Sequence, residues 1–166
     1  MMAVQVSFMF GTRGPRMSNG RLKMLAHLPA SSDFSLAAAV AYFDGRQCGR
    51  RSVQAELAPE ARSPTGFRVR FTSWAVVAWL EEGAEVLADS AELAAGPDLP
   101  APPEVVAGCS RRLSVWSDPG LTADRRAKFW WLAAQLRERF AALHYDHFAV
   151  RWLTDAEPGA APDTAV

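Results

Sequence analysis

The stretch that decides the fold is RLSVWSDPGLTADRRAKFWWLAAQLRERFAALHYDHFAVRWL, residues 112–153. We expect a strand over 112–117, a turn at 118–120, and a helix that starts after Thr122 as N-cap and runs to about Leu143. Large apolar residues spaced three and four apart form one helix face: Phe129, Leu132, Ala133, Leu136, Phe140 and Leu143. Residues 145–153 are expected to return as a closing strand, which makes the stretch a β-α-β unit.

Alternation of apolar and polar residues predicts strands in the first half of the chain. Residues 4–10, 21–28 and 67–71 all alternate in this way. Residues 34–43 fit either a helix, because of their alanines and a capping Ser32 or Asp33, or a strand, because their large residues alternate. The Asp44-Gly45 turn favours a hairpin with a return strand at 51–57.

In the middle of the chain the alternation of apolar and polar residues ends. Trp74 to Glu82 predicts the start of a helix that Gly83 interrupts, and residues 84–95 continue it as helix or loop. Four prolines between Gly96 and Pro103 indicate a connection.

These elements predict the α+β class, with a mixed, mostly antiparallel sheet, helices packed mainly on one face and the C-terminal β-α-β unit. With 166 residues, 49% of them hydrophobic, the chain suits one core. We therefore expect a single domain over residues 1–153. Residues 154–166 lack large apolar side chains, which predicts a disordered tail.

The two cysteines, Cys48 and Cys109, form no C-x-x-C pair and no secreted-type framework. We expect two buried thiols in a reducing, cytoplasmic compartment. The longest apolar run, residues 74–80, is too short to span a bilayer, so no membrane partner is expected. Nothing in the sequence implies a cofactor.

His144, Asp146 and His147 form the sharpest polar cluster, since imidazole and carboxylate suit a metal or acid–base chemistry. On a strand, however, His144 and Asp146 face one way and His147 faces the other. A small metal-dependent or acid–base enzyme centred here is therefore an alternative hypothesis, and no catalytic or metal-ligating residue is assigned.

Basic residues gather in a glycine-rich loop that follows the first expected strand. Arg13, Arg16, Arg21 and Lys23 suit an anion, and Arg50 and Arg51 extend the patch. The loop lacks the Gly-Lys-Ser/Thr ending of a P-loop. Phosphate or nucleic-acid binding is a second alternative, which predicts steep salt dependence.

Charge is separated along a chain whose formal net charge is zero. Residues 81–104 contain seven acidic residues, beginning with Glu81, Glu82 and Glu85, and no basic one. Such a block steers a charged partner. Trp131 lies on the side of the C-terminal helix opposite its apolar stripe, where either another segment of the chain or a partner should cover it.

These features favour a non-enzymatic protein-interaction domain that binds a protein partner, or a second copy of itself, through the acidic region and Trp131. A bacterial inhibitor or immunity-type protein has this size and charge, an analogy that identifies no partner. The acidic block and balanced charge argue against a general nucleic-acid binder.

Overall fold

The computed structural model of the chain describes residues 20–58, 65–147 and 149–153. In these ranges the strands are β1 (Lys23–Leu28), β2 (Gln47–Cys48), β3 (Arg51–Ser52), β4 (Gln54–Ala58), β5 (Gly66–Phe71), β6 (Trp74–Glu82), β7 (Arg111–Ser117), β8 (Leu143–Asp146) and β9 (Arg151–Trp152). The helices are α1 (Leu36–Phe43), α2 (Ala84–Leu93), α3 (Pro103–Ala107) and α4 (Ala123–Phe140). The expected strand at 4–10 and the expected tail at 154–166 lie outside the described residues.

The main sheet has seven strands in the order β4-β5-β6-β7-β1-β8-β9, and its neighbouring strands pair antiparallel. β7 and β8 both run antiparallel to β1, which lies between them, so β7 and β8 are parallel to each other. α4 joins these two strands, which gives a β-α-β unit with one strand inserted. The α+β class and the mostly antiparallel sheet are confirmed.

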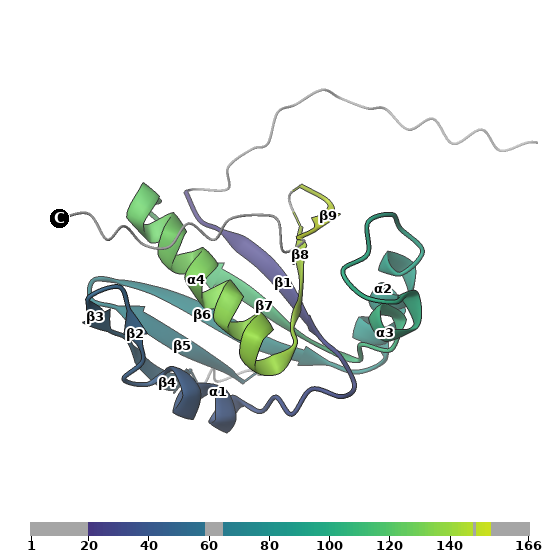
Figure 1. The fold of residues 1–166 in the computed structure, drawn as a ribbon, viewed down its shortest axis with the longest axis horizontal. Coiled ribbons are helices and arrows are strands. Elements are labelled where there is room, and N and C mark those ends of the chain that lie inside the picture. Colours follow the sequence, from purple (N-terminus) through teal and green to yellow (C-terminus); the bar gives the residue numbers. More distant parts are fainter. Residues whose placement is uncertain (1–19, 59–64, 148, 154–166) are drawn as a thin grey trace, which may run out of the picture.

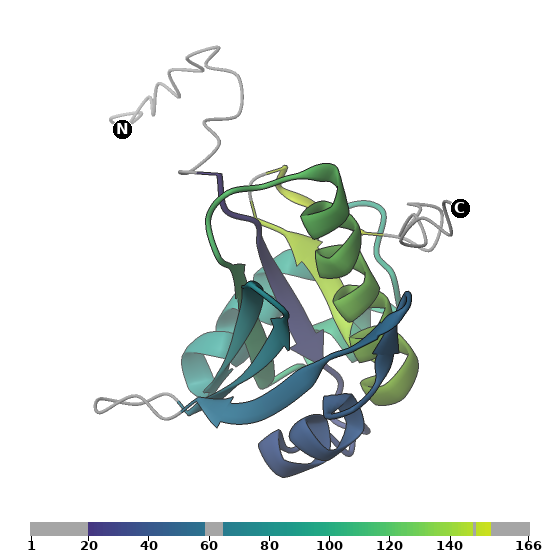
Figure 2. The same cartoon turned by 90° about the vertical axis from the view of Figure 1, so that its left-hand side faces the viewer.

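Helices lie on both sides of this sheet (Figures 1 and 2). Met24 and Ala26 of β1 belong to the core that α1 and α4 cover. Leu25, between them, packs instead in a second cluster with Val106 of α3. Because side chains alternate across a strand, α1 and α4 cover one face, and α2 and α3 lie against the other near one end.

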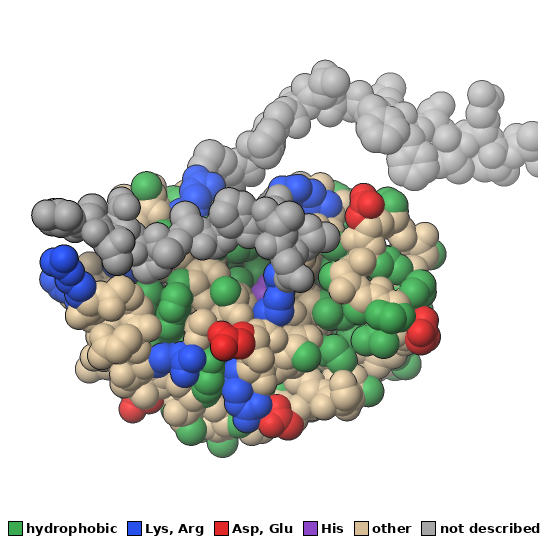
Figure 3. All heavy atoms as spheres, in the orientation of Figure 1, with side chains coloured by type: hydrophobic (Ala, Val, Ile, Leu, Met, Phe, Trp, Pro, Cys, Tyr) green, Lys and Arg blue, Asp and Glu red, His purple; other side chains and the backbone are tan. Residues whose placement is uncertain are grey.

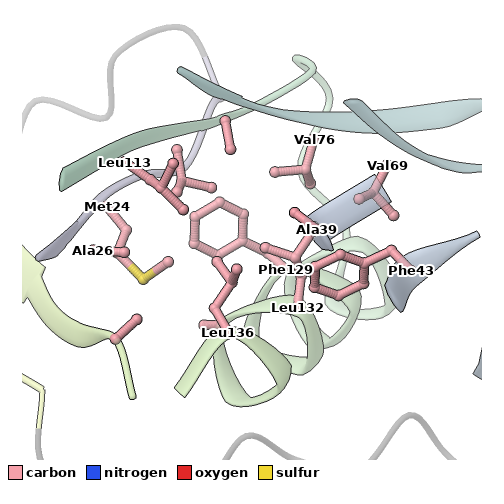
Figure 4. Close-up of a cluster of buried hydrophobic side chains, with 14 of the residues drawn as sticks. Met24, Ala26, Ala39, Phe43, Val69, Val76, Leu113, Phe129, Leu132 and Leu136 are labelled. Atoms are coloured by element: carbon pink, nitrogen blue, oxygen red, sulfur yellow. The ribbon is translucent and has the colours of Figure 1, made fainter. Parts of the chain in front are cut away.

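The main core forms between α4, α1 and the sheet, and Figure 4 shows Phe129 of α4 in its midst. Phe129 is 1% exposed, and its neighbours include Leu113 and Leu136, both fully buried. Phe43 of α1 stacks on Phe67 of β5 with ring centroids 5.8 Å apart. Burying each of these side chains contributes about 1.5–3 kcal/mol.

α4 forms where the sequence predicts it. Thr122 is the N-cap, and its hydroxyl accepts a hydrogen bond from the Arg125 amide at 3.2 Å. The expected stripe is buried at Phe129, Leu132, Ala133, Leu136 and Phe140. The helix ends at Phe140 because Ala141 takes a left-handed conformation with φ 56°, and Leu143 belongs to β8.

The hairpin strand expected over residues 34–43 is wrong, because residues 36–43 form α1. Ser35 caps the helix, its hydroxyl accepting a hydrogen bond from the Ala38 amide at 3.1 Å. Ala39 and Phe43, four residues apart, are both fully buried, which is the helical period. The N-cap and the high helix propensity of alanine outweigh the alternation of the large residues.

The helix expected from Trp74 is also wrong, because residues 74–82 form β6. Val76 and Ala78 face the main core, whereas Val77 and Trp79 lie on the other side of the sheet. Both faces carry apolar side chains, so the run shows no clear period in the sequence. Gly83, with φ 121°, is the N-cap of α2 and joins the strand to the helix.

Two further strands differ from expectation. The closing strand at 145–153 is a hairpin of β8 and β9, and the return strand at 51–57 is divided into β3 and β4.

Cys48 and Cys109 are buried free thiols, as expected, and burial raises the pKa of each to about 11. None of the described helices is long and apolar enough to cross a membrane.

Candidate functional site

The basic loop lies only partly within the described residues. Arg13 and Arg16 fall outside them, and Arg21 is exposed just before β1. The Lys23 ammonium lies 4.5 Å from the ring centroid of Trp116, a cation–π contact on β7. The two described cations therefore lie at the start of β1, and anion binding by this loop stays a prediction.

The structure separates the histidine cluster. His144 is 1% exposed, and its Nδ1 lies 3.3 Å from an Arg137 guanidinium nitrogen of α4. His147 is exposed and lines a cavity on the opposite side of the sheet. Burial, with Arg137 nearby, lowers the pKa of His144 to about 3. The two imidazoles thus do not face a common site.

Trp131 is half-buried within the chain. Its ring makes edge-on contacts with Phe43 of α1 and Phe71 of β5, at centroid distances of 6.1 Å and 5.9 Å. Other segments of the same chain thus cover it, one of the two outcomes expected from sequence. A role of Trp131 in binding a partner remains a prediction, and its contacts within the chain leave only part of the ring exposed.

The acidic residues converge where β6 meets α2. Glu81 and Glu82 end β6, and Glu85 lies in the first turn of α2, where the helix dipole favours a carboxylate. Asp89 and Glu92 follow at helical spacings of four and three, so all three acidic residues of α2 share one side of the helix. We call this set the acidic face: Glu81, Glu82, Glu85, Asp89 and Glu92.

Arg112 of β7 fixes one side of the acidic face. Its Nε donates to Glu81 at 2.7 Å and its Nη1 donates to Asp89 at 2.8 Å. The Arg112 side chain is 16% exposed, whereas those of Glu81 and Asp89 are 34% and 53% exposed, so the guanidinium is shielded and the two carboxylates stay open to solvent. One guanidinium with two carboxylates leaves a net charge of −1.

A buried hydrogen bond also ties α2 to the sheet. The Nδ1 of His27 on β1 lies 3.0 Å from the Ser90 hydroxyl of α2, and both residues are fully buried. The His27 ring meets Trp152 edge-on at 5.4 Å. Burial, together with Arg112, lowers the pKa of His27 to about 4. A neutral His27 therefore helps to hold α2 in place.

The rest of the acidic face is open to solvent. Glu82, Glu85 and Glu92 are exposed, and the described residues include no cation paired with them. Four of the five carboxylates line a hollow of about 720 Å³ between the end of β6 and α2. Arg112, already engaged, is the one cation in the lining of that hollow. This surface is therefore preorganised to attract positive charge.

A second hollow lies between α2, the loop that follows it and the uncovered part of the sheet. Its volume is about 580 Å³, within the range of small-molecule sites. We call it the sheet cavity, lined among others by Lys23, Leu25, Glu92, Asp98, Ser114, Tyr145, Val150, Arg151 and Trp152. Sequence reasoning missed it because its lining comes from segments that only the strand order brings together.

Charged and apolar side chains line both hollows. Within the described ranges, no three His, Cys, Asp or Glu side chains are placed to hold a metal ion together. Comparisons with protein families, curated proteins and solved structures gave no match.

Proposed function

We propose that this protein is a non-enzymatic binding domain that docks a basic protein partner on α2. One observation carries the proposal: α2 presents an acidic row and an apolar stripe side by side to solvent. The acidic row is Glu85, Asp89 and Glu92. The apolar stripe is Ala84, Leu87, Ala88 and Ala91, all exposed and spaced three and four residues apart.

The apolar stripe belongs to a wider apolar surface. Leu87 is 41% exposed, and Val105 of α3 is 37% exposed. Figure 3 shows hydrophobic side chains gathered over α2 and α3, at the right of the view, with few charges among them. Protein interfaces have this composition, with an apolar centre and a charged or polar rim.

The charge of the acidic face selects the class of partner. Exposed carboxylates without cationic partners repel the phosphates of nucleic acid and attract lysine and arginine side chains. Complementary charge speeds association and determines which partner binds, while the apolar stripe supplies buried area. A basic protein, of the kind that a small inhibitor neutralises, is the partner that fits both features.

Affinity purification from the source cell at low salt tests this proposal with two variants. Glu85→Lys reverses a charge in the acidic row, and Leu87→Ser removes the largest side chain of the apolar stripe. Each should reduce recovery of a stoichiometric, basic protein by at least about tenfold, which corresponds to roughly 1.4 kcal/mol.

Matched changes elsewhere serve as controls. Glu138→Lys makes the same charge reversal at an exposed position of α4, and Leu57→Ser makes the same truncation on β4, where Leu57 is 56% exposed. Both should retain the partner. Equal loss in test and control variants, or recovery of no basic protein by the wild type, contradicts the proposal.

A further inference from the structure

The floor of the sheet cavity is a row of one serine and three apolar residues that crosses four neighbouring strands. Ser114, Leu25, Tyr145 and Trp152 lie directly opposite one another on β7, β1, β8 and β9. Tyr145 and Trp152 also contact each other edge-on, with centroids 5.2 Å apart. Such a floor binds an apolar or aromatic group.

Charges of both signs line the cavity. Glu92 and Asp98 come from α2 and the loop that follows it, and Lys23 and Arg151 come from the first residues of β1 and β9. Arg112, also in the lining, is paired with Glu81 and Asp89. Lys23 and His27 are four residues apart on β1, roughly 13 Å at the rise of a strand. Since His27 contacts α2 through Ser90, β1 leads from Lys23 toward α2.

Strained backbone lies on two loops that line the cavity. Asp98, after α2, and Val150, in the β8–β9 turn, both have φ 54°. Val150 is β-branched, for which this conformation is a marked outlier, and it is 73% exposed. A strained, solvent-exposed valine does not stabilise the fold, and such residues are found at ligand-binding positions.

We propose that the sheet cavity binds a short zwitterionic peptide. Its ammonium end faces Glu92 and Asp98, its carboxylate end faces Lys23, and an apolar side chain between them lies on Tyr145 and Trp152. An extended tripeptide spans roughly 10 Å, somewhat less than the roughly 13 Å of β1 between Lys23 and His27, and the long side chains of Lys23 and Glu92 extend toward its two ends. This site shares Glu92 with the acidic row of the proposed function, but neither Glu85 nor Leu87 lines it. Loss of the protein partner in Glu85→Lys or Leu87→Ser is therefore distinguishable from loss of peptide binding.

Titration calorimetry with the tripeptide Gly-Phe-Gly tests the proposal. The peptide with free termini should bind at one site. Its N-acetylated form, which lacks the ammonium, and its C-amidated form, which lacks the carboxylate, should each bind about fivefold more weakly, the factor that corresponds to roughly 1 kcal/mol.

Two variants test which charged residue of the cavity binds which terminus of the peptide. Lys23→Gln should reduce the preference for the free over the amidated peptide, and Glu92→Gln should reduce the preference for the free over the acetylated peptide, since Arg151 and Asp98 remain in the lining. Arg21→Gln and Glu104→Gln, which change exposed charges outside the lining, should keep both preferences.

Val150→Gly gives an independent readout. Glycine adopts a positive φ without strain, so the variant should raise Tm while it weakens all three peptides alike. Absence of saturable binding up to about 10 mM peptide overturns the proposal. Equal affinity for the free and blocked peptides does so as well.

Discussion

Two buried histidines should make this protein sensitive to mild acid. His27 and His144 are 0% and 1% exposed. Burial, with Arg112 and Arg137 as the nearby charges, lowers the pKa of His27 from 6.5 to about 4 and that of His144 from 6.5 to about 3. Both stay neutral in the folded protein at pH values where the unfolded chain binds protons. The free energy of unfolding should therefore be at its full value above pH 6.5 and decrease as the pH falls.

The size of this decrease follows from the two pKa values. One pKa unit corresponds to about 1.4 kcal/mol. Between pH 7 and pH 5 each histidine should contribute a loss of about 2 kcal/mol, or about 4 kcal/mol together. Domains of this kind have about 5–15 kcal/mol of stability in total. Ordinary carboxyl groups titrate near pH 4, so this interval isolates the histidines.

Urea unfolding followed by tryptophan fluorescence at pH 7, 6 and 5 measures the effect. His27→Gln and His144→Gln should each be less stable at pH 7, because each removes a buried partner, and each should lose about half of the pH dependence. His147→Gln removes an exposed histidine and should keep the wild-type slope. A wild-type loss below about 1 kcal/mol over the interval, or an equal reduction of slope in all three variants, refutes the reasoning.

Three further outcomes follow from packing, and each has a simple measurement. Phe43→Ala should lower the unfolding free energy by roughly 3–5 kcal/mol in urea titrations, whereas Leu57→Ala, at an exposed position, should change it by less than about 0.5 kcal/mol. Cys48 and Cys109 should react with a thiol reagent only after denaturant is added, because burial raises both pKa values to about 11; rapid reaction of the native protein would show that the core is open. Gly66→Ala should lower Tm, because an added Cβ would lie 2.4 Å from the Ala78 carbonyl oxygen; an unchanged Tm would mean that β5 and β6 can separate there.

The sequence correctly predicts those elements whose residue pattern fits only one type of secondary structure. In α4, the N-cap Thr122 and a stripe with spacings of three and four agree, and the helix forms as expected. In β6 both faces are apolar, so a buried strand looks like a helix until its neighbours are known. In α1, alternation of large residues indicated a strand, and the deciding cap, Ser35, lies inside the segment rather than before it.

The candidate sites show the same limit. Glu81, Glu82 and Glu85 are close in sequence, and local structure alone brings them to one surface. The sheet cavity needs β1, β8 and α2 to meet, which depends on strand order. Periodicity contains no information on strand order. The sequence therefore identifies Lys23 as a basic residue but does not show that it lines the same cavity as Glu92.

The measurement that tests the central claim most directly is the salt dependence of association between this protein and the basic partner recovered with it. If the acidic face steers that partner, the association rate constant should fall steeply between about 0.02 M and 0.15 M salt, over which range screening shortens to about 8 Å. Glu82→Gln with Glu85→Gln should flatten this dependence and leave the dissociation rate nearly unchanged. An association rate that ignores salt, or that is equally steep in the double variant, contradicts the claim that the acidic face binds the partner.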